Sequence, residues 1–138
     1  MGISLSTHQL QPGVLRKIIK ELNYSSSRLL EEYRKEEKGV PESYHYTLPC
    51  FTPDAQSPNN FDSSAVLRHF QKIRPFRENK DTIDEVIEQL KKLKFRDTQE
   101  TNVSVPTDFF EHKCFILAIF KQFSACMDKM LKLIPKAN

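Results

Sequence analysis

The histidines and cysteines could support catalysis or metal binding, but their spacing favours neither. The four histidines are His8, His45, His69 and His112, and none begins an HExxH pattern. The cysteines are far apart, so no CxxC pair is present. His112 and Cys114 are close in sequence, yet on a helix their side chains would point about 200° apart. They could not share a metal ion there, so we expect no metal site.

Carboxylate pairs and glycine-rich loops would indicate acid–base catalysis or phosphate binding. The pairs Glu31–Glu32 and Glu36–Glu37 lie among lysines and arginines, as is typical of a solvated ion-pair face. The chain has only 3 glycines, so neither a P-loop nor a GxGxxG motif can be written. A GxSxG motif is also absent. We therefore expect no catalytic residues, no cofactor and no enzyme activity.

The composition fits a single domain over residues 1–138. Apolar residues make up 38% and charged residues 28%, which supports a modest core and excludes a chain too polar to fold. The net charge is +3, from 21 basic and 18 acidic residues, and this balance argues against a nucleic-acid binder. No apolar run approaches the roughly 18 residues of a membrane-spanning helix, so we expect no membrane insertion.

Apolar residues recur every three or four positions in four segments, which predicts an all-α fold. The predicted helices cover about residues 13–38, 63–74, 81–95 and 108–134. Gly39 followed by Pro41 is a typical stop signal after the first helix. Ser25 and Ser26 fall on the apolar stripe of that helix and weaken its middle.

The last predicted helix combines a clear start signal with a bulky apolar stripe. Asp108 and Glu111 fit a capping box, in which each side chain accepts from the other residue's main-chain N–H. Phe109 begins the stripe, so we expect its ring in the core. The stripe continues through Ile116, Ile119, Phe120, Phe123, Met127, Met130 and Ile134.

The connections between these helices are long, short and long. Residues 40–62 contain too many prolines to form a helix or a central strand, and residues 96–106 form the second long connection. A short loop joins only antiparallel neighbours, whereas parallel neighbours need a long crossover. The pattern therefore predicts an up-up-down-down four-helix bundle with long AB and CD crossover loops, the topology of helical cytokines.

The most specific sequences lie mainly in the loops. The chain contains, in order, KGVPES (38–43), YTLPCFTPDAQSPNN (46–60), DEVIEQLKKLKF (84–95), ETNVSVPTD (100–108), KCFIL (113–117) and QFSACMD (122–128). Together these segments resemble the interleukin-31 family of interleukin-6-type cytokines over about residues 14–134. The resemblance implies a secreted, extracellular, monomeric ligand. It would bridge the interleukin-31 receptor A subunit and the oncostatin M receptor β subunit and trigger Janus kinase/STAT signalling in itch and skin inflammation.

The resemblance implies that the first receptor is bound by exposed flanks of the first and third helices. Because Leu22 and Leu90 belong to the core stripes, the outward flanks can be chosen from helical spacing. Gln89 stands where a histidine can occur in the family. Without the resemblance, a solvated charged face would be the preferred interpretation. The residues assigned to the receptor A face are Lys17, Glu21, Glu85, Gln89 and Lys92.

The resemblance places the oncostatin M receptor site at the start of the last helix. Related cytokines carry a Phe-x-x-Lys motif there, which corresponds to Phe110 and Lys113 in this chain. The spacing of three puts both side chains on one flank, and an exposed aromatic beside a cation suits a binding hot spot. The alternative is that Phe110 covers the end of the bundle beneath the long loop.

The three cysteines leave two disulfide pairings open. Family relatives bridge a long-loop cysteine to the beginning of the last helix, which favours Cys50–Cys114 here. Helical spacing argues the other way, because Cys114 points away from the apolar stripe and Cys126 lies nearer its edge. Cys50–Cys126 is therefore the alternative pairing.

Two sequons, at Asn23 and Asn102, are candidate glycosylation sites. Asn102 lies in a predicted surface loop, whereas Asn23 lies on a predicted helix away from the apolar stripe. A different class of function also fits the helices: an intracellular helical adaptor or interaction domain whose thiols stay reduced. The disulfide state under non-reducing conditions separates the two hypotheses.

Overall fold

The computed structural model describes residues 12–43, 45–51, 60–93 and 103–134. These residues form helices α1 (Pro12–Glu36), α2 (Ser63–Ile73), α3 (Asp81–Lys91) and α4 (Phe109–Leu133), with a short 3-10 helix, η3 (Arg74–Phe76), after α2. Within the described ranges, β-structure is limited to one isolated bridge between Phe51 and Phe61. The all-α prediction is confirmed.

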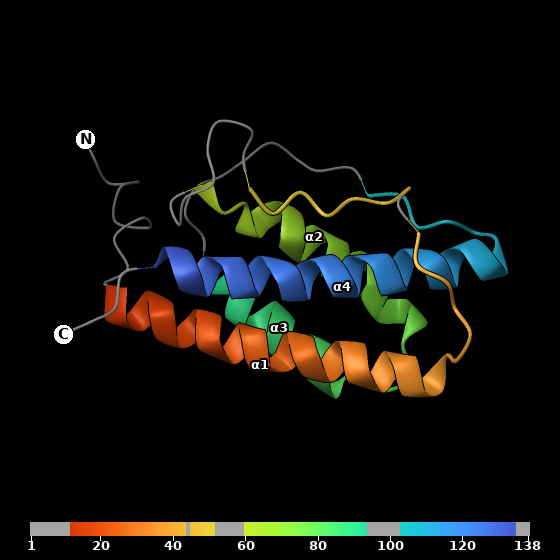
Figure 1. The fold of residues 1–138 in the computed structure, drawn as a ribbon, viewed down its shortest axis with the longest axis horizontal. Helices are drawn as coiled ribbons and strands as arrows, with labels where there is room; N and C mark the ends of the chain where they lie inside the picture. Colours follow the sequence, from red (N-terminus) through yellow and green to blue (C-terminus); the bar gives the residue numbers. More distant parts are fainter. Residues whose placement is uncertain (1–11, 44, 52–59, 94–102, 135–138) are drawn as a thin grey trace.

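The helices form the predicted up-up-down-down bundle. Arg16 near the start of α1 donates to the carbonyl of Leu131 near the end of α4 (3.2 Å), so these two helices run antiparallel. Ser63 at the start of α2 donates to the carbonyl of Leu93 just beyond α3 (2.6 Å), so α2 and α3 are also antiparallel. Figure 1 shows α1 and α2 running in one direction and α3 and α4 in the other.

The apolar stripes of the four helices meet in one core. Phe70 of α2 lies near two rings of α4, with centroids 6.0 Å from Phe120 and 4.7 Å from Phe123. The two serines that interrupt the stripe of α1 are buried as well, and Ser26 donates to the carbonyl of Asn23 (2.7 Å). This local bond satisfies the hydroxyl, so α1 packs through its middle without an unpaired polar group at Ser26.

The helix ends follow local signals, with small differences from the predicted bounds. Gly39 adopts a positive φ of 84°, the left-handed conformation of a residue that ends a helix, and α1 stops at Glu36. Helix α3 ends at Lys91, earlier than the predicted residue 95. The N–H of Leu93 donates to the carbonyl of Leu90 (3.0 Å) in a tighter turn, and residues 94 and 95 lie outside the described part of the chain.

The start of α4 differs from the prediction in two ways. The Asp108 side chain accepts from the N–H of Glu111 (2.9 Å), as a capping box requires. The Glu111 carboxylate does not return this bond and instead accepts from the hydroxyl of Tyr46 (2.6 Å). The prediction that Phe109 lies in the core is wrong, since its side chain is 75% exposed. Burial along α4 begins only at Cys114, because the first turn extends beyond the packed part of the bundle.

The first long connection runs along α4 and is fixed there by one side chain. Gln122 donates to the carbonyl of Tyr46 (2.6 Å) and accepts from the N–H of Leu48 (2.7 Å). Lys121 also pairs with Glu42 across 2.5 Å. The main chain at Tyr46 and Leu48 therefore lies beside the second half of α4, while the Tyr46 side chain reaches back to its start.

The path of this loop determines which cysteine bonds to Cys50. Cys50 is bonded to Cys126, with Cα atoms 6.4 Å apart, and Cys114 is free. The favoured pairing of Cys50 with Cys114 is wrong, because Gln122 holds the loop one turn before Cys126 and about 12 Å along α4 from Cys114. Cys114 also faces the interior, with 3% of its surface exposed, and does not point away from the core.

Candidate functional site

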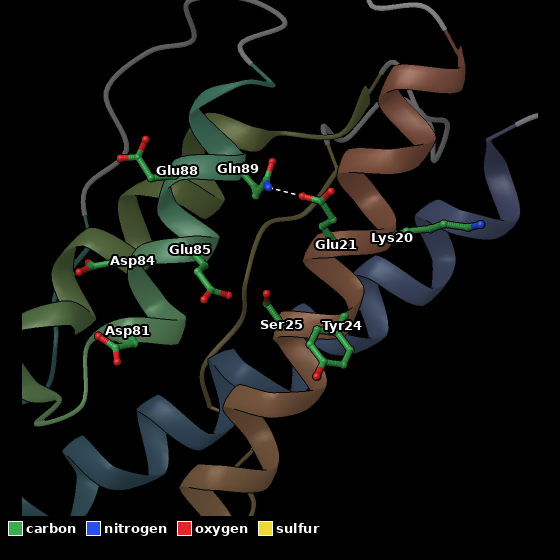
Figure 2. A pocket seen from close by; sticks show the side chains of 9 residues that line it. All are labelled: Lys20, Glu21, Tyr24, Ser25, Asp81, Asp84, Glu85, Glu88 and Gln89. Carbon is green, nitrogen blue, oxygen red and sulfur yellow. Dashed lines mark hydrogen bonds between the residues drawn. The ribbon is translucent and has the colours of Figure 1, made fainter.

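An acidic groove lies between the exposed flanks of α1 and α3 (Figure 2). It exists because the two helices contact each other through their apolar stripes, which leaves their outer flanks apart. The lining includes five carboxylates and one lysine, so the groove favours a basic partner. The lining residues are Lys20, Glu21, Tyr24, Ser25, Asp81, Asp84, Glu85, Glu88 and Gln89.

Three of the five residues predicted for the receptor A face meet in this groove. The Gln89 amide of α3 donates to the Glu21 carboxylate of α1, and Figure 2 shows the two side chains pointing toward each other. Glu85 lies one turn before Gln89 and is exposed. Lys17 and Lys92 are also exposed but are not among the residues that line the groove.

The groove carboxylates differ in their availability to a partner. The Arg74 guanidinium bonds Asp84 (2.5 Å) and lowers the pKa of that carboxyl. Lys91 lies 3.8 Å from Glu88. Within the described residues, Glu85 makes no ion pair with a basic side chain. Glu85 and Asp81, both exposed and neither ion-paired among the described residues, are therefore the groove carboxylates available to receive a cation from outside.

Sequence reasoning did not select several groove residues. Tyr24 stands on the rim with 68% of its side chain exposed, and Asp81 and Glu88 lie on the same flank of α3 as Glu85. The spacing of Asp81, Glu85 and Glu88 by four and three residues is a signal that could have revealed a single acidic flank.

The predicted oncostatin M receptor site, Phe110 and Lys113, lies at the start of α4. Phe110 is 52% exposed, so about half of its surface is open to a partner. Lys113 makes its ring contact with Phe109. Its ammonium nitrogen lies 4.2 Å from the ring centroid of Phe109 and 2.7 Å from a carboxylate oxygen of Glu37. The motif lysine is therefore held in place by an aromatic face and by an anion just beyond the end of α1.

Of the two sequon asparagines, only Asn23 lies among the described residues. Asn23 lies on α1 and is partly exposed, whereas the third residue of its sequon, Ser25, is 5% exposed. Asn102 lies outside the described residues. Glycosylation at Asn23 and Asn102 stays a prediction.

The described ranges contain neither a metal-binding cluster nor a membrane-spanning helix. No group of three or more His, Cys, Asp or Glu side chains lies close enough there to hold a metal ion. No helix among these residues combines the length and the hydropathy needed to cross a bilayer.

A long–short–long bundle of four helices with two exposed, chemically different faces is the architecture of a helical cytokine. The family model described as Interleukin 31 matches residues 4–133. The chain is 50% identical over 138 residues to Interleukin-31 of Homo sapiens, covering 96% of this chain and 83% of the human protein. It is 30% identical over 140 residues to Interleukin-31 of Mus musculus, covering 94% and 85% respectively. No solved structure matches it significantly.

The chain therefore belongs to the interleukin-31 family. Members of this family are cytokines, which act by binding receptors and are not enzymes. The family membership favours the cytokine over the alternative of an intracellular adaptor.

Proposed function

We propose that this chain is a secreted cytokine that bridges the interleukin-31 receptor A subunit and the oncostatin M receptor β subunit. Bridging would bring two receptor tails together and activate Janus kinase/STAT signalling, with itch and skin inflammation as outcomes. The observation that carries the proposal is the presence of two separate faces, an acidic groove and an aromatic helix end, on one chain. Because both faces lie on one chain, a monomer suffices.

The acidic groove is the proposed receptor A face. Glu21 and Gln89 form its centre, since their hydrogen bond joins α1 to α3. Glu85 supplies an unpaired carboxylate, which would steer a basic receptor surface and pair with it. Lys17 and Lys92 lie outside the groove lining, so we place them at the edge of the contact, where exposed charges contribute little affinity.

The start of α4 is the proposed face for the oncostatin M receptor β subunit. Phe110 is a large, exposed ring with two rotatable side-chain bonds, so ordering it on binding costs little entropy. Lys113 is already held by Glu37 and the Phe109 ring, and a positioned cation loses little freedom when a partner binds.

The disulfide supports secretion. Disulfides persist in oxidising compartments and are rare in the cytosol, so Cys50–Cys126 fits an extracellular protein. In that compartment the sequons at Asn23 and Asn102 would be available for glycosylation.

Surface plasmon resonance on the two receptor ectodomains tests the proposal. We expect the chain to bind the receptor A ectodomain alone, and the second ectodomain to bind the preformed complex. Glu85→Lys should weaken the first step by about tenfold or more, since it puts a cation against a basic partner. Glu31→Lys is the matched control, because Glu31 is an exposed residue of α1 in a different hollow, beside α4.

Phe110→Ala completes a crossed design. It should leave receptor A binding unchanged and weaken recruitment of the second ectodomain by about tenfold or more. Circular dichroism should show native helix content in every variant. A well-folded wild-type chain that binds neither ectodomain would overturn the proposal, and loss of receptor A binding in Phe110→Ala would overturn the assignment of the two faces.

A further inference from the structure

A second hollow lies on the exposed side of α2, between that helix, η3 and the end of the second long connection. Its described lining contains two basic side chains and no carboxylate, which is the opposite charge balance to that of the acidic groove. The rest of the lining is mostly apolar. We call this site the basic hollow, and the lining residues used below are Arg68, Lys72, Pro75, Phe76, Val103 and Val105.

The two cations of the basic hollow have no partner within the described ranges. Arg68 and Lys72 are four residues apart on α2, so their side chains lie on one flank of the helix. Neither makes an ion pair there, and α2 itself contains no Asp or Glu. The Nε–H of Arg68 is buried, yet it has no hydrogen-bond acceptor among the described residues. The guanidinium is therefore free to turn its paired donors toward an incoming carboxylate.

The exposed ring of the basic hollow is held in place by the residues on either side of it. Arg74, at the start of η3, is bonded to Asp84 of α3. Arg77 is 6% exposed and lies 2.7 Å from the Glu36 carboxylate. Both arginines are thus neutralised within the chain, while the Phe76 ring between them stays 53% exposed. A ring on a segment held at both ends needs little reordering to bind a partner.

The basic hollow is separate from both proposed receptor faces. Its lining shares no residue with the acidic groove. The Phe76 ring meets His112 of α4 edge-on, with ring centroids 4.3 Å apart. Phe110 lies two residues before His112, and this spacing turns it about 200° around the helix, away from the hollow. Burial lowers the pKa of His112, so its ring adds no charge beside the hollow at neutral pH.

The spacing of the lining fits an extended peptide segment. Arg68, Lys72 and Phe76 follow one another at intervals of four residues, which correspond to about 6–8 Å along α2 and η3. Alternate side chains of an extended segment are about 7 Å apart on one face. Two carboxylates and an apolar side chain at alternate positions would therefore meet the two cations and the ring in turn.

The mixed chemistry of the hollow selects among anionic partners. A sulfated polysaccharide would neutralise the cations but has no apolar side group for Phe76, Val103 and Val105. A bilayer surface meets protruding side chains and does not enter a hollow. A protein segment supplies carboxylates and an apolar side chain together, so it complements both parts of the lining.

We propose that the basic hollow is a docking site for an acidic segment of a partner protein, in which two carboxylates and an apolar side chain occupy alternate positions. The inference goes beyond the proposed function, because it concerns a third surface and can be measured on this chain alone.

Fluorescence anisotropy with the synthetic peptide Phe-Ser-Glu-Ser-Glu-Ser-Phe tests the charged part. The peptide presents the same pattern in either direction, and it carries a label at one end and an amide at the other. We expect saturable binding that Lys72→Glu weakens by about tenfold or more, since it puts a carboxylate against the peptide's carboxylates. Lys35→Glu is the matched control, because Lys35 is an equally exposed lysine in the hollow beside α4. A peptide with Lys in place of both Glu residues should not bind.

The apolar part is tested by a double-mutant cycle. Phe76→Ala should weaken binding by about fivefold, and replacing both peptide Phe residues by Ser should weaken binding to the wild-type chain to a similar extent. The two changes together should cost no more than either alone, because each removes the same contact. Losses that simply multiply would overturn the contact with Phe76. Circular dichroism should show native helix content in each variant, and the exposed position of Lys72 keeps its charge reversal from disturbing the core.

Three results would overturn the proposal. The first is no saturable binding of the peptide at concentrations up to about 1 mM. The second is equal weakening by Lys72→Glu and Lys35→Glu, which would show attraction to the net charge of the chain. The third is binding of heparin in place of the peptide, lost in Lys72→Glu and unchanged in Phe76→Ala, which would make the occupant a polyanion. Since no receptor takes part in this test, each of these results leaves the proposed function standing.

Discussion

Removal of the Cys50–Cys126 disulfide tests how the long connection contributes to stability. The bridge joins residues separated by 76 positions, and closing a loop of that size in the unfolded chain is worth about 4 kcal/mol in the chain-entropy model. Adjustments of the folded state commonly reduce this gain. We therefore expect Cys50→Ala to lower the free energy of unfolding by about 2–4 kcal/mol. This is a large share of the roughly 5–15 kcal/mol that holds an ordinary domain together.

Guanidinium chloride unfolding, followed by the helical circular dichroism signal, measures the effect. Cys114→Ala is the matched control, because Cys114 is buried but unbonded and its truncation should cost only about 1 kcal/mol. A reductant should lower the stability of the wild-type chain and of Cys114→Ala by equal amounts. It should not change Cys50→Ala, which no longer has the bridge.

Loss of the response in Cys114→Ala would refute the reasoning. If Cys114→Ala and Cys50→Ala both abolish the response to reductant, Cys114 is the bridge partner of Cys50 and the loop does not follow the path set by Gln122. Peptide mapping under non-reducing conditions gives a direct check. A fragment that joins Cys50 to Cys114, with no Cys50–Cys126 fragment, would contradict the structure.

Three further predictions concern stability. Asp108→Ala should cost about 1 kcal/mol by removing the cap of α4, and chemical unfolding that shows no loss would contradict the cap. Phe123→Ala should cost about 3–5 kcal/mol, since the ring is fully buried against Phe70, and a cost under about 1 kcal/mol would contradict that packing. Burial lowers the pKa of His69 below its ordinary 6.5, so the unfolded chain binds the extra proton more readily and stability should fall as the pH drops below about 6.5. Unfolding midpoints measured from about pH 7.5 to about pH 5 check this, and His69→Gln should show a smaller drop.

The fold was predictable because its signals are local. The apolar period of each segment is written in neighbouring residues, and the long–short–long connections restrict how the helices can run. Gly39 and Asp108 end and begin their helices through interactions within a few residues, so both positions could be identified in advance. The all-α, up-up-down-down prediction used no contact between distant parts of the chain.

The errors arose where distant contacts decide the outcome. Helical spacing predicted that Phe109 lies on the core side of α4. Spacing does not show how far along α4 the neighbouring helices extend. At the first turn of α4 they do not cover Phe109. The choice between Cys114 and Cys126 likewise depended on where the long loop crosses α4. That crossing is set by Gln122, whose contact with the loop cannot be read from its neighbours in sequence.

The packing of α1 explains how the two proposed faces can stay at a fixed distance from each other. Helix α1 connects both: Glu21 in its first half lines the groove, and Glu37, directly after its last residue, pairs with Lys113 of the second face. These two residues are separated by roughly four to five helical turns, about 24 Å along the axis. A helix packed along its length cannot change that separation without breaking the core. Core substitutions such as Phe123→Ala should therefore reduce the amount of folded protein while leaving the receptor affinities of each folded molecule unchanged, whereas Glu85→Lys should do the reverse.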